Sequence, residues 1–177
     1  MRVVNARPPR ELDRPGEWEK TVPATLPRTV SPATPHTVQD YGRHGWTVTE
    51  AFDGLRLITD ERIAAVELTG PLAAGVRRYL RANNLSGPVI EIRGAQRREI
   101  HLVVGAGKAA RAIEMLREAG AIVHTGGASF PLPLAGGSVD WGIAPDEARW
   151  VPPLVAISAA VRAVSARALS RSGRLAC

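Results

Sequence analysis

The fold is decided by residues 63–125, which read IAAVELTGPLAAGVRRYLRANNLSGPVIEIRGAQRREIHLVVGAGKAARAIEMLREAGAIVHT. Apolar or alternating segments of strand length stand between two stretches whose apolar residues recur at helical spacing. Pro71 suits the first turn of a helix and Gly120 the position just after one, so both mark helix boundaries. The predicted strands are Ile63–Leu68, Pro88–Ile92, Glu99–Val104 and Ala121–His124, and the predicted helices lie between Pro71 and Asn83 and at Lys108–Ala119.

This order of elements, β-α-β-β-α-β, is typical of the ferredoxin-like fold, which RNA-recognition-type domains share. In that arrangement the sheet is antiparallel and both helices cover one of its faces. The other face is free to bind a ligand or to be covered by the rest of the chain. We therefore expect an α+β protein with a ferredoxin-like, RRM-like core.

The segments around this core complete the predicted organisation. Seven prolines between positions 8 and 35 leave little room for helix or ladder strand, so residues 1–37 are expected to form a disordered, proline-rich arm. An α+β domain follows at 38–154, and a basic C-terminal helix and tail at 155–177. Further expected elements are a short helix at Val38–His44, strands Trp46–Glu50 and Leu55–Ile58 joined by an Asp53-Gly54 turn, an edge segment at Ser129–Leu134, and a terminal helix at Pro152–Leu169.

Composition limits the classes of protein that this chain can belong to. The single cysteine is Cys177, so no internal disulfide framework or cysteine-based metal site can form. Residues 1–20 lack the apolar segment of a signal peptide, and no run of eighteen apolar residues occurs. We expect a cytoplasmic protein with no membrane partner.

The net charge of +6 is concentrated at the two ends of the chain. Residues 37–154 hold thirteen basic and thirteen acidic side chains, whereas residues 155–177 hold four arginines and no acid. A basic helix of this kind binds phosphate groups or an acidic partner, or is simply well solvated. The candidates for contact with nucleic acid are Arg162, Arg167, Arg171 and Arg174, with Trp46 as a ring for base stacking or, alternatively, for the core.

A glycine-rich loop, Gly105–Ala110, matches the G-x-G-x-x-[GA] dinucleotide fingerprint. The match makes Gly105, Gly107 and Lys108 candidates for binding a nucleotide cofactor. The fingerprint also requires parallel strands and an acid at the end of the next strand, but this strand belongs to a predicted hairpin and the next one ends at His124. A tight turn between strand and helix is the alternative explanation, and we expect no cofactor.

No complete catalytic site is present in the sequence. His101 and His124 lie on strands that would be neighbours, so they could meet, but a third metal ligand is not evident and no metal site is expected. No Ser-His-Asp order and no pair of acids spaced for two metal ions occurs. The sequence therefore leaves open whether the chain is an enzyme, and the lack of a complete constellation favours a non-catalytic role.

Short motifs along residues 45–157 resemble those of actinobacterial proteins with the bifunctional DNA primase/polymerase (Prim-Pol) N-terminal domain, specifically short stand-alone relatives. Their order and spacing carry the resemblance. The motifs are Gly45-Trp46-Thr47-Val48, Phe52-Asp53-Gly54-Leu55, Gly75-Val76-x-x-Tyr79-Leu80, Gly87-Pro88-Val89, Arg97-x-x-Ile100-His101-Leu102-Val103-Val104, Pro131-Leu132-Pro133, Gly136-Gly137 and Trp150-Val151-Pro152-Pro153.

The resemblance implies an RNA-recognition-like core and a role near DNA. Active members of the family bind metal and nucleotide with a D-x-D motif, a histidine and a further acid. In this chain Glu67 is the one acid of the first strand and Thr69 stands at the second position, while His101 matches the histidine and Asp140 is the candidate for the further acid. The resemblance thus implies a catalytically degenerate member with a binding, regulatory or scaffold role in DNA replication or on a mobile element.

Two other functions fit the same sequence. The first is a nucleotide- or NAD(P)-binding protein that uses the loop Gly105–Ala110. The second is a protein-interaction adaptor that uses the proline-rich arm and the basic helix.

Overall fold

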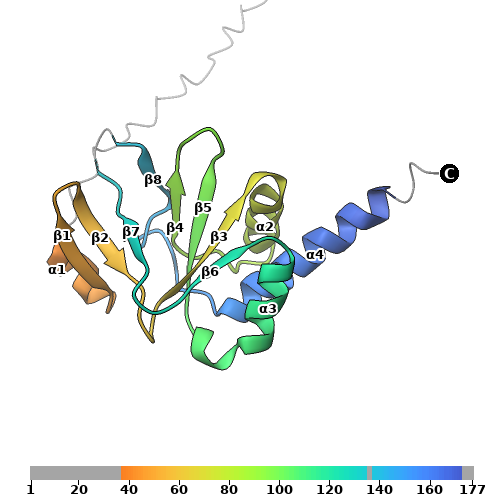
Figure 1. Cartoon of the computed structure of the whole chain (residues 1–177), viewed down its shortest axis with the longest axis horizontal. Helices are drawn as coiled ribbons and strands as arrows, with labels where there is room; N and C mark the ends of the chain where they lie inside the picture. Colours follow the sequence, from red (N-terminus) through yellow and green to blue (C-terminus); the bar gives the residue numbers. More distant parts are fainter. Residues whose placement is uncertain (1–36, 135–136, 173–177) are drawn as a thin grey trace, which may run out of the picture. The chain divides into compact units, whose positions relative to one another are not determined.

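The computed structural model describes residues 37–134 and 137–172. The proline-rich arm up to residue 36, and Arg174 in the tail, lie outside these ranges. The expected α+β class with antiparallel sheets is confirmed, and Figure 1 shows two sheets and a group of helices. No helix among the described residues is both long and apolar enough to cross a membrane.

The larger sheet has five antiparallel strands in the order β6-β3-β5-β4-β8. The four strands expected from residues 63–125 are present, with ends within two residues of the expected positions. The sequence analysis did not assign β8, which pairs with β4 through an irregular register. The strands are β3 (Ala64–Thr69), β4 (Val89–Ile92), β5 (Arg98–Val103), β6 (Ile122–His124) and β8 (Val139–Ile143).

Three helices cover one face of this sheet. Apolar residues of β3, such as Val66 and Leu68, are buried in one cluster with Leu80, Leu116 and Ile157 of the helices. Burial of this apolar area is the main favourable contribution to the packing. The helices are α2 (Gly70–Ala82), α3 (Ala110–Glu118), which follows the 3₁₀ turn η1 (Ala106–Lys108), and α4 (Leu154–Ser172).

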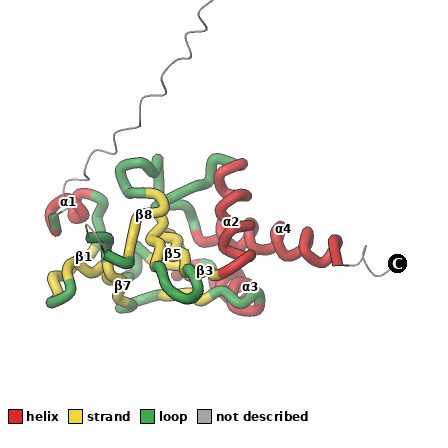
Figure 2. The backbone as a smooth tube through the Cα atoms, turned by 90° about the horizontal axis from the view of Figure 1, so that it is seen from above, coloured by secondary structure: helices red, strands yellow, loops and turns green. Residues whose placement is uncertain are grey.

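A smaller sheet covers the opposite face, as Figure 2 shows from above. Its strand order is β1-β2-β7, and its residues Leu57 and Phe130 are buried against Ala65, Ile90 and Ile100 of the larger sheet. The face that the sequence left open to a ligand is therefore filled by apolar side chains. The smaller sheet consists of β1 (Thr47–Ala51), β2 (Gly54–Ile58) and β7 (Ser129–Pro131), and α1 (Val38–Arg43) precedes it.

Two local features of the smaller sheet have clear causes in the sequence. A capping box between Thr37 and Asp40 starts α1. The β1–β2 hairpin turns at Phe52 and Asp53, and Gly54 is already paired with Ala51. The expected turn is thus displaced by one residue, and glycine is needed because its φ is +118°.

Helix α4 shares the core of the domain, although the sequence suggested a separate basic segment. Pro152 accepts a hydrogen bond from the Val104 amide and Leu154 donates one to the Val104 carbonyl, which ties the start of α4 to the end of β5. Ile157, Ala160 and Val161 are buried against the other helices. The exposed side of α4 is the part that remains available to a partner.

The contact between α2 and α4 depends on a glycine. A Cβ added at Gly75 would stand 2.6 Å from Cγ1 of Val164. Valine is short and branched at Cβ, so it cannot swing away from this contact easily. By contrast, a Cβ added at Gly42 in α1 would meet no atom within 4 Å.

We predict that Gly75→Ala lowers the free energy of unfolding by up to about 2 kcal/mol. Overpacking costs about 1–3 kcal/mol and outweighs the gain in helix propensity of about 1 kcal/mol. The measurement is urea unfolding of the single variants and of Gly75→Ala combined with Val164→Ala, which should relieve the clash. Gly42→Ala is the matched control and should be neutral or stabilising, and equal behaviour of the two alanine variants would contradict the packing described here.

Candidate functional site

The register of the larger sheet separates the two residues that the Prim-Pol resemblance places in one catalytic site. His101 is opposite Val66 on the face that the helices cover, whereas Glu67 is opposite Ile100 on the other face. Neighbouring residues of a strand point to opposite faces, so Glu67 and His101 cannot act on one ligand. His124 is opposite Ala65, on the face of Glu67, so His101 and His124, which could have met, lie on opposite faces of the sheet.

Glu67 instead forms a pair with His124. The histidine Nε2 lies 3.0 Å from Glu67 Oε2, and Arg98 donates to Glu67 Oε1 at 3.2 Å. The His124 ring also packs edge-on against Phe130, with ring centroids 4.9 Å apart. A carboxylate that orients a histidine is one component of acid–base catalysis, but no nucleophile or second acid accompanies it in the described contacts.

Asp140, the candidate for a further acid, lies far from this pair. It is on β8, where it is paired with Glu91 of β4 and forms an ion pair with Arg93. In the strand order, β5 and β4 stand between β3 and β8. Within residues 37–134 and 137–172, no group of three or more His, Cys, Asp or Glu side chains is placed to hold a metal ion.

His101 belongs to a buried network of charges under α2. Arg77 of α2 bridges the carboxylates of Glu91, at 2.9 Å, and Glu99, at 3.2 Å, and Arg97 contacts the same two carboxylates. His101 Nε2 lies 3.7 Å from Glu99 Oε2, which is too far for a hydrogen bond, and both atoms are buried without a hydrogen-bond partner. The network joins α2 to β4 and β5, and its burial indicates a structural role.

The charges around Glu99 decide its ionisation. Burial by itself raises the pKa of this carboxyl, but the His101 ring and the Arg77 and Arg97 guanidinium groups outweigh it and hold the pKa below its ordinary value of 4.5. Because the folded protein favours the ionised form, Glu99 contributes stability above the pKa of the unfolded chain. That contribution is lost as the pH falls through the lower pKa of the folded state.

The glycine-rich loop Gly105–Ala110 does not follow a parallel strand, as the corresponding loop of a dinucleotide-binding site does. Its strand, β5, is antiparallel to both of its neighbours, whereas the fingerprint requires parallel strands. Gly105 adopts a left-handed conformation with φ +75°, and a Cβ at Gly105 or Gly107 would meet no atom within 4 Å. Lys108, the third candidate of this loop, lines a cleft between α3 and α4.

Trp46 is not available for base stacking, which corrects the expectation from the sequence. It is only 5% exposed, and its ring stacks on Tyr41 with centroids 6.0 Å apart. Trp141 packs on it from another side, with ring centroids 6.4 Å apart. The three rings form part of the core under the smaller sheet.

The basic side chains fall into two groups that differ in their partners. Seven arginines, mostly on strands and loops, lie within ion-pair distance of an acid: Arg43, Arg56, Arg62, Arg77, Arg93, Arg97 and Arg98. Eight basic side chains have no such acid among the described residues, and all except Arg149 are on the helical layer of α2, η1, α3 and α4: Arg78, Arg81, Lys108, Arg111, Arg117, Arg149, Arg162 and Arg167. Arg162 and Arg167, two of the expected nucleic-acid contacts, are exposed, and Arg171 lies on the last turn of α4.

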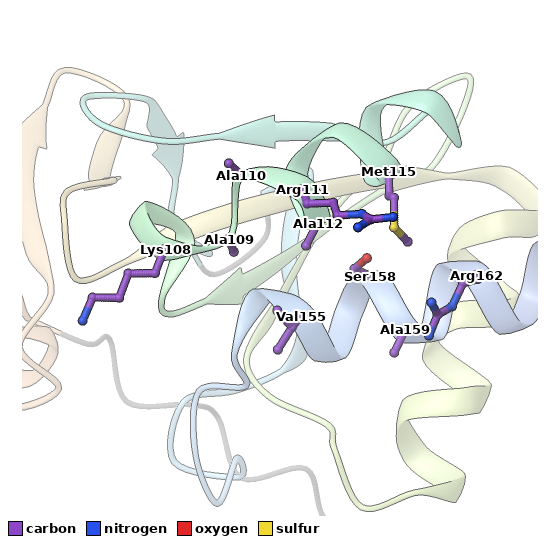
Figure 3. A pocket seen from close by; sticks show the side chains of 10 residues that line it. All are labelled: Lys108, Ala109, Ala110, Arg111, Ala112, Met115, Val155, Ser158, Ala159 and Arg162. Atoms are coloured by element: carbon purple, nitrogen blue, oxygen red, sulfur yellow. The ribbon is translucent and has the colours of Figure 1, made fainter.

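Two clefts run along the sides of α4. The α3–α4 cleft has a volume of about 420 Å³ and is lined by Lys108, Arg111 and Arg162 (Figure 3). The α2–α4 cleft has a volume of about 770 Å³ and is lined by Arg78 and Arg167. No acid lines either cleft, so both present positive charge to a ligand. Clefts of this kind can hold the phosphate groups of a polyanion.

The sequence analysis named Arg162 and Arg167 but missed Arg78 and Arg111. The net charge of residues 37–154 is zero, because acids elsewhere in the domain cancel the charge of these two arginines. The net charge of the segment therefore gave no indication of them. A usable signal was present in α2, which has three arginines and no acid.

Comparisons of the chain with models of protein families, with curated proteins and with solved structures found no match.

We predict that the stability difference between wild type and Glu99→Gln depends on pH. At neutral pH the variant should lose about 1–3 kcal/mol, because it removes a charged partner from a buried network. The difference should shrink as the pH falls below 4.5, where protonation of Glu99 removes the same charge from the wild type.

Urea unfolding at a series of pH values measures this difference. Glu118→Gln, an exposed change on α3, is the control and should remain within about 0.5 kcal/mol of wild type throughout. A deficit of Glu99→Gln that is the same at every pH would show that the charge of Glu99 does not contribute.

Proposed function

We propose that this chain is a non-catalytic, nucleic-acid-associated module whose helical layer binds the phosphate backbone. The observation that carries the proposal is the segregation of basic side chains: those on strands and loops are mostly paired with acids, while those on α2, η1, α3 and α4 are mostly unpaired. Unpaired cations next to acid-lacking clefts attract phosphate groups and release the counterions around them.

The mode of binding would differ from that of RNA-recognition domains. Those domains stack bases on the open face of their sheet. Here Trp46, Leu57 and Phe130 fill the corresponding face, and the unpaired cations lie on the opposite side. Contacts to phosphates position a protein on nucleic acid without reading its sequence, so we expect weak sequence preference.

We also propose that the core is ferredoxin-like and that the chain is a degenerate relative of the Prim-Pol N-terminal domain. The succession β3-α2-β4-β5-α3-β6 and the spatial order β6-β3-β5-β4 support the first statement. The location of Glu67 and His101 on opposite faces supports the absence of nucleotidyl transfer. Within this proposal the module acts in the cytoplasm, in DNA replication or on a mobile element, with DNA or a replication protein as its partner.

The structure gives less support to the two alternatives. A nucleotide- or NAD(P)-binding role for Gly105–Ala110 would require parallel strands, and β5 is antiparallel to its neighbours. An adaptor role would depend on the proline-rich arm, of which only residue 37 is described, together with the basic helix α4, whose exposed cations serve the proposed phosphate binding equally well.

We predict that Arg78→Gln combined with Arg81→Gln and Arg167→Gln weakens binding of single-stranded DNA about tenfold at low salt. The slope of the logarithm of the affinity against the logarithm of the salt concentration should become shallower by about 2. Each lost phosphate contact of a single strand reduces the magnitude of this slope by about 0.7. Fluorescence anisotropy of a labelled oligothymidylate at several sodium chloride concentrations measures both quantities.

The matched control removes the same total charge from the other group of arginines. Arg43, Arg62 and Arg93 are exposed and form ion pairs with Asp40, Asp60 and Asp140. The triple Gln variant of these arginines should bind DNA with nearly the affinity and salt dependence of wild type. If both triple variants lose the same affinity, only net charge matters, and if wild type binds no DNA the proposed function is wrong.

A further inference from the structure

The α3–α4 cleft contains a hydroxyl group that is available to a ligand. Ser158 of α4 is only 5% exposed, and its hydroxyl forms no hydrogen bond with any described residue. Figure 3 shows this hydroxyl pointing into the space between α3 and α4. A hydroxyl that makes no bond within the protein and faces a cleft can donate a hydrogen bond to a charged ligand there, and such bonds are stronger than those between neutral groups.

Two guanidinium groups are close to the same space. Arg111 reaches in from α3 and Arg162 lies one turn beyond Ser158 on α4, so the two side chains stand on opposite sides of the cleft (Figure 3). Neither has an acid within ion-pair distance among the described side chains. Like charges on the two walls of a cleft repel, and an anion bound in the cleft attracts both. The planar guanidinium group forms paired hydrogen bonds that match the oxygens of a phosphate.

The first turn of α3 adds a further feature to the cleft. Ala110 and Ala112 line it, and no side chain caps this end of the helix. The first turn also contains no acid. The free amide groups at a helix N-terminus favour negative charge, so they reinforce the two arginines. The ammonium group of Lys108 points away from Ser158 in Figure 3 and is left out of the site.

We infer that the α3–α4 cleft is a binding site for one phosphate group. Arg111 and Arg162 neutralise its charge, and Ser158 donates a hydrogen bond to one of its oxygens. The volume of about 420 Å³ exceeds that of a phosphate, so the group can be part of a larger molecule. The bound phosphate group belongs either to the backbone of a nucleic acid or to a free phosphate monoester. The inference rests on the proposed function only if the phosphate belongs to a nucleic acid.

The test is a titration of the full chain, labelled with ¹⁵N, with inorganic phosphate at constant ionic strength. Chemical shifts of the amides of residues 110–112 and 158–162 should change and saturate. Ser158→Ala should weaken phosphate binding about tenfold, since it removes one hydrogen bond to a charged group. Ser165→Ala is the matched control because Ser165 lies on the same helix but lines the α2–α4 cleft, and it should bind phosphate as wild type does.

Titrations with adenosine monophosphate and with oligothymidylate distinguish the two sources. Tighter binding of the monophosphate at these amides assigns a free monoester, and tighter binding of the oligonucleotide there assigns a backbone phosphate. Phosphate binding without DNA binding would leave the inference standing and reject the proposed function. The inference is overturned if the chemical shifts do not saturate, or if the largest changes occur around Arg78 and Arg167. It is also overturned if Ser158→Ala binds phosphate and oligonucleotide as wild type does. The last comparison requires that Ser158→Ala and Ser165→Ala keep the wild-type spectrum outside the cleft.

Discussion

Burial of both faces of the five-stranded sheet is the constraint on which the rest of the structure depends. Strands β3 and β5 have apolar side chains in two separate clusters, one under the helices and one under the smaller sheet. A strand that is covered on both sides cannot offer its side chains to a large ligand. The chemistry that remains accessible is therefore at the margins of the sheet and on the outer surfaces of the helices.

The distribution of charge follows from this constraint. Glu67 and Glu99 of the sheet are buried, and a buried charge must be paired because its desolvation is costly. The network of Arg77, Glu91 and Glu99 and the pair of Glu67 and His124 satisfy this requirement. Arginines on the outer side of α2, α3 and α4 are solvated and need no partner, so the helical layer retains a net positive charge that a phosphate can use.

The order and type of elements could be predicted because they depend on local patterns. The periods of apolar residues and the positions of Pro71 and Gly120 placed the strands and helices of residues 63–125 within two residues of their observed ends. Strand β8 was missed because it lies between glycines and a proline and pairs with a bulge. Trp46 was offered as a stacking ring because the sequence does not say which side of the first hairpin becomes core.

The sequence by itself determined that this is an α+β chain with a basic C-terminal helix. Only the tertiary structure decided which residues share a site. The register of the strands places His101 and Glu67 on opposite faces and brings Glu67 to His124. A shift of the register by one residue would turn every side chain of a strand to the other face. Docking of α4 against α3 brought Arg111, Ser158 and Arg162 to one cleft, and such contacts between distant segments leave no periodic trace in the sequence.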